Sequence, residues 1–130
     1  MAEWEDVRRV ALSLPETSER ERETGPDWRV RDKLFVWERP LRKSDLAALA
    51  ELGRTAPTGP LLGARIAHLD VKEELIAAEP DVYLTIPHFD GYAAILARLD
   101  VIGLDELTEL VTEAWLCRAP KRLAAQFRNR

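Results

Sequence analysis

Apolar residues recur along the chain with two periods, one typical of helices and the other typical of strands. Residues 3–13 place an apolar side chain every three or four positions and begin with acidic residues, which the positive end of a helix dipole favours. Residues 104–115 show the same period more clearly. Pro120 cannot continue that helix but suits the first position of a new one, so a separate short helix is expected over residues 121–128.

Between these helices, apolar and polar residues alternate as they do in strands. Residues 28–31 and 34–38 predict a hairpin that turns at Asp32-Lys33. Residues 17–24 alternate acids and arginines without apolar partners, which fits either an exposed edge strand or a loop. Residues 64–69 predict a further strand.

Two shorter helices are expected in the central part of the chain. Ser44 is a suitable N-cap for a helix that Gly53 ends, with Leu46 and Leu49 facing inward. The second helix is expected over residues 70–78, where Asp70 and Glu73 have the spacing of a capping box.

The stretch between the last two predicted strands, residues 83–86 and 94–99, is rich in polar, aromatic and turn-forming residues. Pro87 ends the first of these strands because it has no backbone N–H to donate. Asp90-Gly91 supplies a turn in which glycine adopts a positive φ without steric cost. The turn presents three side chains with candidate chemistry, His88, Asp90 and Tyr92.

Length and composition fit one domain over residues 1–130, large enough to bury a core without disulfides or a structural metal. Most of the predicted strands are joined by loops too short for a parallel crossover. The expected fold class is therefore α/β in its α+β form, an antiparallel sheet of about five or six strands covered by the N- and C-terminal helices. One cysteine, Cys117, and two histidines are too few for a closed zinc site, so neither a metal nor a cofactor is expected.

Membrane insertion and secretion are not expected from the sequence. No run of about 18 apolar residues is present to span a bilayer. The first 13 residues are acidic and amphipathic, unlike a secretory signal. Together these features predict a cytoplasmic protein without a membrane partner.

The chain carries a net charge of −4, which argues against a nucleic-acid partner, but its charges are unevenly distributed. Residues 28–43 hold six Lys or Arg against two acids, and residues 118–130 hold five against none. Basic segments form a binding face only when they meet in space. Otherwise they are solvated charges on edge strands and at a terminus, and the sequence leaves both interpretations open.

Motifs of the common enzyme classes are absent, since no phosphate-binding glycine loop, nucleophile elbow, paired-cysteine motif or HExxH occurs. This absence favours a binding protein over an enzyme without excluding one. His88 and Asp90 could form an acid–base pair, with Lys33 adding a cation for a phosphate or carboxylate. Alternatively, Asp90 accepts backbone donors in the turn and His88 bonds nearby carbonyls, which would make both residues structural.

Three motifs in a fixed order carry a family resemblance. They are W-R-V-R-D-K-L-F at residues 28–35, T-I-P-H-F-D-G-Y at residues 85–92 and A-P-K-R-L at residues 119–123. With them the chain resembles the MmcQ/YjbR-like family of small bacterial proteins over most of its length. The resemblance implies a frataxin-like (CyaY-like) α/β fold and a proposed double-wing DNA-binding motif, and no established catalytic residues. Asp32 departs from the family, which usually places Gly in this tight turn.

Three functions are compatible with these observations. The first, favoured by the resemblance and the two basic segments, is weak, phosphate-dominated binding to duplex DNA. The second is a small-molecule or anion-binding protein, enzymes included, with a pocket near His88, Asp90 and Lys33. The third is a protein-interaction module. The residues expected to contact nucleic acid are Arg29, Arg31, Lys33, Lys121 and Arg122, and those expected to contact a small ligand are His88, Asp90 and Tyr92.

Overall fold

The computed structural model describes residues 1–129, which form five α-helices, one 3₁₀ helix and six strands. In chain order they are α1 (Trp4–Ser13), β1 (Thr17–Arg22), β2 (Gly25–Val30), β3 (Lys33–Glu38), α2 (Lys43–Glu51), β4 (Leu61–Arg65), α3 (Leu69–Ala78), β5 (Tyr83–Leu84), η1 (Pro87–Phe89), β6 (Ala94–Arg98), α4 (Leu104–Arg118) and α5 (Lys121–Arg128).

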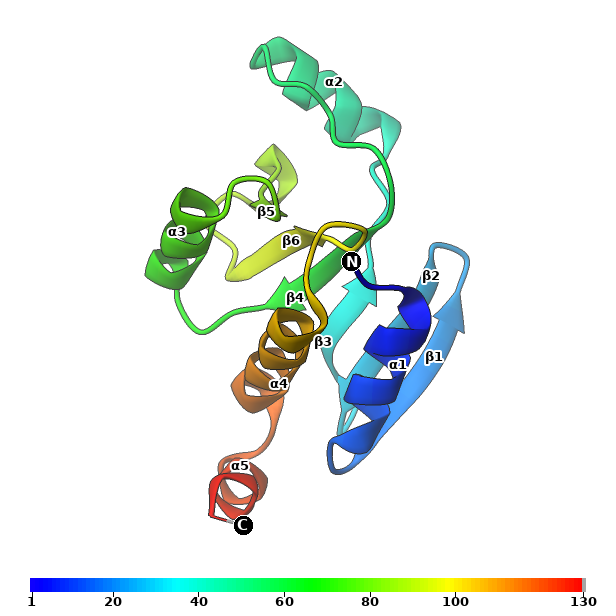
Figure 1. Ribbon diagram of the computed structural model, residues 1–130, viewed down its shortest axis with the longest axis vertical. Coiled ribbons are helices and arrows are strands. Elements are labelled where there is room, and N and C mark those ends of the chain that lie inside the picture. The colour runs from blue at the N-terminus through cyan, green and yellow to red at the C-terminus, as the bar shows by residue number, and fades with distance from the viewer. Residues whose placement is uncertain (130) are drawn as a thin grey trace.

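The strands form one sheet in the order β1-β2-β3-β4-β6-β5, and every neighbouring pair is antiparallel (Figure 1). This confirms the predicted α+β fold with an antiparallel sheet. The acidic and basic alternation of residues 17–24 belongs to an edge strand, because β1 pairs only with β2. The chain after β4 crosses to β5 at the opposite edge and then returns to pair β6 with β4.

Helices α1 and α4 cover the same face of the sheet, as expected (Figure 1). The strands project apolar side chains such as Trp28 and Ile95 to this side, where they form one buried cluster with Leu107 and Trp115 of α4. Trp115 also donates its indole N–H to the carbonyl oxygen of Pro15 at 3.1 Å. That hydrogen bond ties the segment after α1 to α4 and fixes the two helices over the core.

The opposite face of the sheet is covered only in part. Phe89 of η1 and Leu49 of α2 belong to a second, smaller apolar cluster on this side. Trp37 of β3 lies in the same cluster, directly across from Gly63 of β4. A Cβ at Gly63 would lie 2.4 Å from Cε2 of the indole, so glycine is needed for Trp37 to pack against β4.

Several predicted strand boundaries are wrong: β4 ends at Arg65 rather than at residue 69, because α3 begins at Leu69, and β5 ends at Leu84 rather than at residue 86. The first hairpin turns at Arg31-Asp32, one residue earlier than predicted, because Val30 pairs directly with Lys33. Strand β4 begins at Leu61, three residues earlier than predicted, because it already pairs there with β6.

The predicted cap of α2 is also wrong. The carboxylate of Asp45 accepts the backbone N–H of Arg42 at 2.8 Å, so the helix begins before Ser44. Leu49 faces inward as expected, but Leu46 is 45% exposed. Asp45 fills the inward position one turn before Leu49, and its burial is tolerated because it pairs with Arg39.

Candidate functional site

The β2–β3 turn combines a strained backbone with tight polar contacts. Arg31 (φ 46°) and Asp32 (φ 68°) both adopt the left-handed conformation that a two-residue hairpin turn requires. Neighbouring Glu16 (φ 53°) is left-handed too, and its carbonyl accepts the N–H of Arg31 at 3.3 Å. The Glu16 carboxylate accepts from Arg31 Nε at 2.6 Å and from Nη2 at 3.2 Å, and these bonds lower the pKa of Glu16 below its ordinary value. The contacts hold the turn in one conformation.

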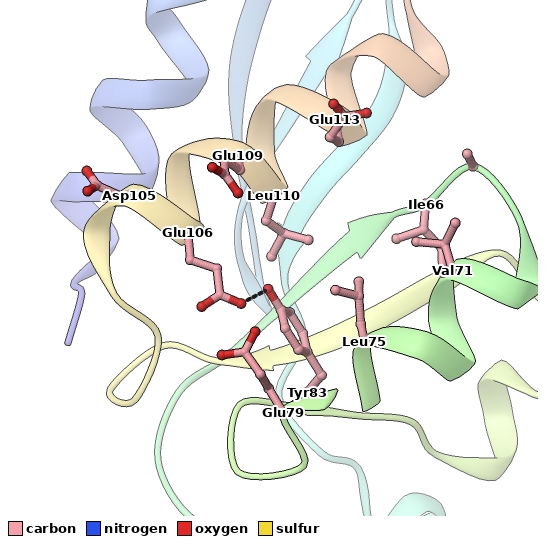
Figure 2. Close-up of a pocket in the computed structure, with 11 residues that line it drawn as sticks. Ile66, Val71, Leu75, Glu79, Tyr83, Asp105, Glu106, Glu109, Leu110 and Glu113 are labelled. Carbon is pink, nitrogen blue, oxygen red and sulfur yellow. Dashed lines mark hydrogen bonds between the residues drawn. The ribbon is translucent and has the colours of Figure 1, made fainter. Parts of the chain in front are cut away.

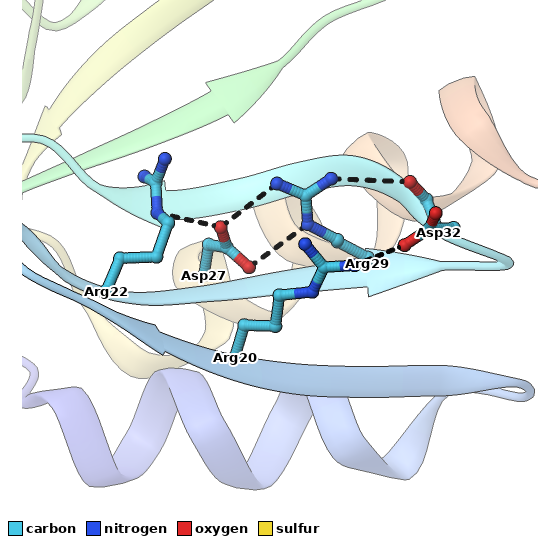
Figure 3. A network of polar contacts seen from close by, with 5 residues as sticks. All are labelled: Arg20, Arg22, Asp27, Arg29 and Asp32. Carbon is cyan, nitrogen blue, oxygen red and sulfur yellow. Dashed lines mark hydrogen bonds and ion pairs between the residues drawn. The ribbon is translucent and has the colours of Figure 1, made fainter.

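A chain of ion pairs runs along the open face of β1 and β2 (Figure 3). At its centre, fully buried Asp27 binds the guanidinium groups of Arg22 at 2.9 Å and Arg29 at 3.3 Å. Towards the turn, Arg29 Nη1 donates to the carbonyl oxygen of Asp32 at 3.4 Å, and Arg20 pairs with the Asp32 carboxylate at 2.7 Å. Arg29 is therefore held on the sheet, with its side chain only 20% exposed.

The C-terminal basic segment reaches the same end of the molecule as the β2–β3 turn. Arg31 and Arg122 border one hollow of about 330 Å³, with Pro120 and Leu123 in its wall. Within residues 1–129, none of the three cations Lys33, Lys121 and Arg122 has an acidic partner. We call the five predicted nucleic-acid contacts the basic tip: Arg29, Arg31, Lys33, Lys121 and Arg122.

The Asp90-Gly91 turn has the predicted geometry. Gly91 has φ 74°, and the N–H of Tyr92 donates to the carbonyl of Phe89 at 3.0 Å, as in a type II turn. The Tyr92 hydroxyl accepts a hydrogen bond from Arg65 Nη1 of β4 at 2.8 Å, and the Arg65 guanidinium lies 4.8 Å from the centre of the Tyr92 ring. Tyr92 is therefore committed to a contact with β4.

The structure does not bring the predicted ligand residues to one site. His88 lies exposed in η1, against the ring of Phe89 at a centroid distance of 5.7 Å. His88 borders a cavity with Glu38, which ends β3, whereas Lys33 begins that strand. Asp90 and Tyr92 do not border this cavity.

Lys72 of α3 is a buried polar residue that the sequence analysis missed. Its ammonium donates to the carbonyl oxygens of Phe89 at 2.8 Å and Tyr92 at 3.1 Å, so it ties the segment between β5 and β6 to α3. Burial lowers the pKa of Lys72, and the charge of Asp90 partly opposes that effect. No sequence pattern indicates this role, because a lysine in a short amphipathic helix ordinarily lies on the solvated face.

The cavity beside His88 has a volume of about 260 Å³, and we call it the Arg39 cavity. Arg39 is itself buried, with Nη1 paired to the Asp45 carboxylate at 2.9 Å and its guanidinium 5.6 Å from the centre of the Phe89 ring. The side chains that matter for its chemistry are Arg22, Trp37, Glu38, Arg39, Arg42, His88 and Phe89.

The pair of Arg39 and Asp45 fixes the charge state of this region. Burial alone would raise the pKa of Asp45, but the Arg42 N–H and the Arg39 guanidinium outweigh burial. The pKa of Asp45 therefore lies below its ordinary value, and the pair is ionic at neutral pH.

A larger cavity, of about 590 Å³, lies between α3, α4 and β5 (Figure 2). Apolar side chains including Leu75 and Leu110 line it, and carboxylates of α4 border it. The Tyr83 hydroxyl donates to the Glu106 carboxylate at 2.6 Å. The side-chain contact with Glu106 raises the pKa of Glu79, which also borders the cavity. None of the side chains that line this cavity carries a buried N or O atom without a hydrogen-bond partner within residues 1–129.

Within residues 1–129, no group of three or more His, Cys, Asp or Glu side chains is placed to hold a metal ion. None of the helices in the same range combines the length and the apolar character needed to cross a bilayer.

Comparison with known proteins confirms the family resemblance. A family model described as YjbR matches residues 12–117. One protein of Mycobacterium bovis and two of Mycobacterium tuberculosis are each 52% identical over 127 residues, which cover 98% of this chain and 96% of theirs. All three are described as uncharacterized proteins. No solved structure matches the chain.

Proposed function

The chain belongs to the YjbR family, and we propose that it binds the sugar–phosphate backbone of duplex DNA, weakly and without base readout, through the basic tip. The observation that carries the proposal is the hollow shared by Arg31 and Arg122. It joins two basic segments that are far apart in the sequence. A DNA backbone presents regularly spaced phosphates, so a binding surface needs several cations within reach of one another.

The five residues of the basic tip contribute unequally to this proposal. Lys33, Lys121 and Arg122 have no acidic partner within residues 1–129, so their charge is available to phosphates. Arg29 is held by Asp27, and Arg31 by Glu16. We therefore assign the main phosphate contacts to the first three and a supporting role to Arg29 and Arg31.

The rigid β2–β3 turn supports a wing-like contact. A hairpin that keeps one conformation loses little conformational entropy when it binds. The Arg31–Glu16 and Arg20–Asp32 pairs, with the left-handed backbone between them, hold the turn in such a state. Lys33 follows the turn directly and is exposed.

Fluorescence anisotropy of a labelled duplex, measured over a range of salt concentrations, tests the proposal. If about three phosphates are engaged, the logarithm of the association constant should fall against the logarithm of the salt concentration with a slope of roughly −2.7. Replacing Lys33, Lys121 and Arg122 together by Ala should flatten that slope and weaken binding for every duplex sequence alike.

A matched control removes three cations that lie outside the basic tip. The triple variant of Arg9, Lys43 and Arg54 to Ala changes the net charge by the same amount, and its binding should stay close to that of the unchanged protein. Equal losses in the two triple variants would mean that net charge alone drives binding. That result, or no binding at low salt, would overturn the proposal.

A further inference from the structure

Arg39 carries a buried hydrogen-bond donor that nothing within residues 1–129 satisfies. Its side chain is 6% exposed, and Nη1 donates to the Pro40 carbonyl and pairs with the Asp45 carboxylate. Nη2 has no partner and is closed to solvent. Buried polar groups in native proteins are nearly always hydrogen-bonded, so an orphaned guanidinium nitrogen calls for a missing partner. A guanidinium with one free edge suits an anionic oxygen, especially that of a carboxylate or phosphate.

The walls around Arg39 are aromatic and held in place. Phe89 packs against Trp37 edge to face, with ring centroids 6.3 Å apart, and it also lies under the Arg39 guanidinium. Trp37 is fixed in turn because it packs against Gly63. A cavity of about 260 Å³ with such walls accommodates a small molecule with a single ring.

The charges around the cavity favour a single negative charge on the ligand. Two of the arginines that border it are already paired, Arg22 with Asp27 and Arg39 with Asp45. Glu38 also borders the cavity, and a ligand with two negative charges would face this third carboxylate. The remaining basic side chains at the border are Arg42 and His88.

We propose that the Arg39 cavity binds a small organic monocarboxylate with an apolar, ring-sized body. The carboxylate lies between Arg42 and Arg39, whose side chain turns slightly so that Nη2 donates to it. The apolar body packs against Trp37 and Phe89. This site lies at the opposite end of the β2–β3 hairpin from the basic tip. Ligand binding here can therefore be tested independently of DNA binding.

Benzoate is a suitable probe because it combines one carboxylate with one ring. In ¹⁵N-labelled protein at constant ionic strength, increasing benzoate should shift the indole N–H signal of Trp37 and saturate, whereas the indoles of Trp28 and Trp115, on the other face of the sheet, should shift little. Benzyl alcohol has the same ring without the charge and should not saturate. Inorganic phosphate tests the alternative anion and should bind more weakly than benzoate.

Substitutions separate the site from general charge effects. Arg42→Gln should weaken benzoate binding about tenfold, because it removes a charge-assisted contact. Lys43→Gln makes the same charge change at the next position, outside the cavity wall, and should leave the affinity unchanged. Arg39→Lys keeps a cation beside Asp45 but lacks Nη2, and it should weaken binding while the Trp115 indole signal stays in place as a sign of an intact core.

Four results would overturn the proposal. The first is the absence of a saturable shift at Trp37. The second is equal binding of benzyl alcohol, which would leave only an apolar crevice. The third is an equal effect of Arg42→Gln and Lys43→Gln. Tighter binding of phosphate than of benzoate would overturn the assignment to a monocarboxylate.

Discussion

The two ends of the β2–β3 hairpin both gather basic side chains, but they hold them in different ways. At the basic tip, Lys33, Lys121 and Arg122 are exposed and have no acidic partner within residues 1–129. Their attraction for an anion is long-ranged, undirected and screened by salt. At the other end, Arg39 is buried, paired with Asp45 and fixed over an aromatic ring. Exposed cations suit an extended polyanion, whereas a buried arginine suits one small anion in one orientation.

The two cavities differ in a related way. The cavity bordered by α4 is more than twice as large as the Arg39 cavity, at about 590 against 260 Å³. Its Tyr83 hydroxyl is bonded to Glu106, and within residues 1–129 no side chain that lines it carries a buried polar atom without a partner. The smaller cavity is bordered by a residue with such an atom, Arg39 Nη2. An unsatisfied buried group is therefore a better guide to a ligand here than volume.

The largest expected difference between the two hairpin ends is in the stability of their ion pairs. Asp45→Ala leaves the buried Arg39 charge and the Arg42 N–H without their acceptor, and it should lower the free energy of unfolding by roughly 3–5 kcal/mol. Arg20→Ala breaks the exposed pair with Asp32 and should cost less than about 1 kcal/mol. Urea unfolding followed by circular dichroism measures both. Similar losses in the two variants would show that the ends do not differ in this respect.

A smaller effect is expected from the support of the aromatic wall. In Gly63→Ala the new methyl group would lie 2.4 Å from the Trp37 indole, which must then move. Overpacking of this kind costs roughly 1–3 kcal/mol, and a displaced Trp37 should also abolish benzoate binding.

Gly103→Ala is the matched control, because nothing lies within 4 Å of a Cβ at that position and its φ is an ordinary −76°. It should change stability by less than about 1 kcal/mol and leave benzoate binding intact. If Gly63→Ala leaves the free energy of unfolding unchanged, Trp37 can move without cost. The inference that Trp37 forms a fixed wall of the Arg39 cavity would then be wrong.

The sequence predicted the parts of the fold that follow from local pattern. Helical spacing located α1 and α4, Pro120 located the start of α5, and short connections indicated an antiparallel sheet. Asp90-Gly91 identified a turn with positive φ at Gly91, because few other residues adopt that conformation at low cost. In these segments the local preference and the packed structure agree.

The candidate sites depend on contacts that are distant in the sequence, and there the pattern was a poor guide. Arg39 belongs to a basic run that resembles a solvated surface, but η1 and α2 close over it and leave it buried. Arg31 is predicted from the sequence to contact nucleic acid, yet its guanidinium already pairs with Glu16 from the segment before β1. His88 and Tyr92 both contact the ring of Phe89, but only Tyr92 is also held by β4, because Arg65 donates a hydrogen bond to its hydroxyl.

The smallest effect expected concerns the segment that carries His88 to the border of the Arg39 cavity. Gly91 has φ 74° with open space around it, so Gly91→Val should be disfavoured by backbone strain alone, by roughly 1–2 kcal/mol. His88 is exposed, and His88→Ala should leave the melting temperature nearly unchanged while weakening benzoate binding, because His88 borders the cavity. Thermal melting and benzoate titration of both variants separate the structural role of Gly91 from the proposed electrostatic role of His88. If His88→Ala lowers the melting temperature more than Gly91→Val does, His88 is a structural residue. The electrostatic contact with the ligand at the cavity border must then be assigned to Arg42 alone.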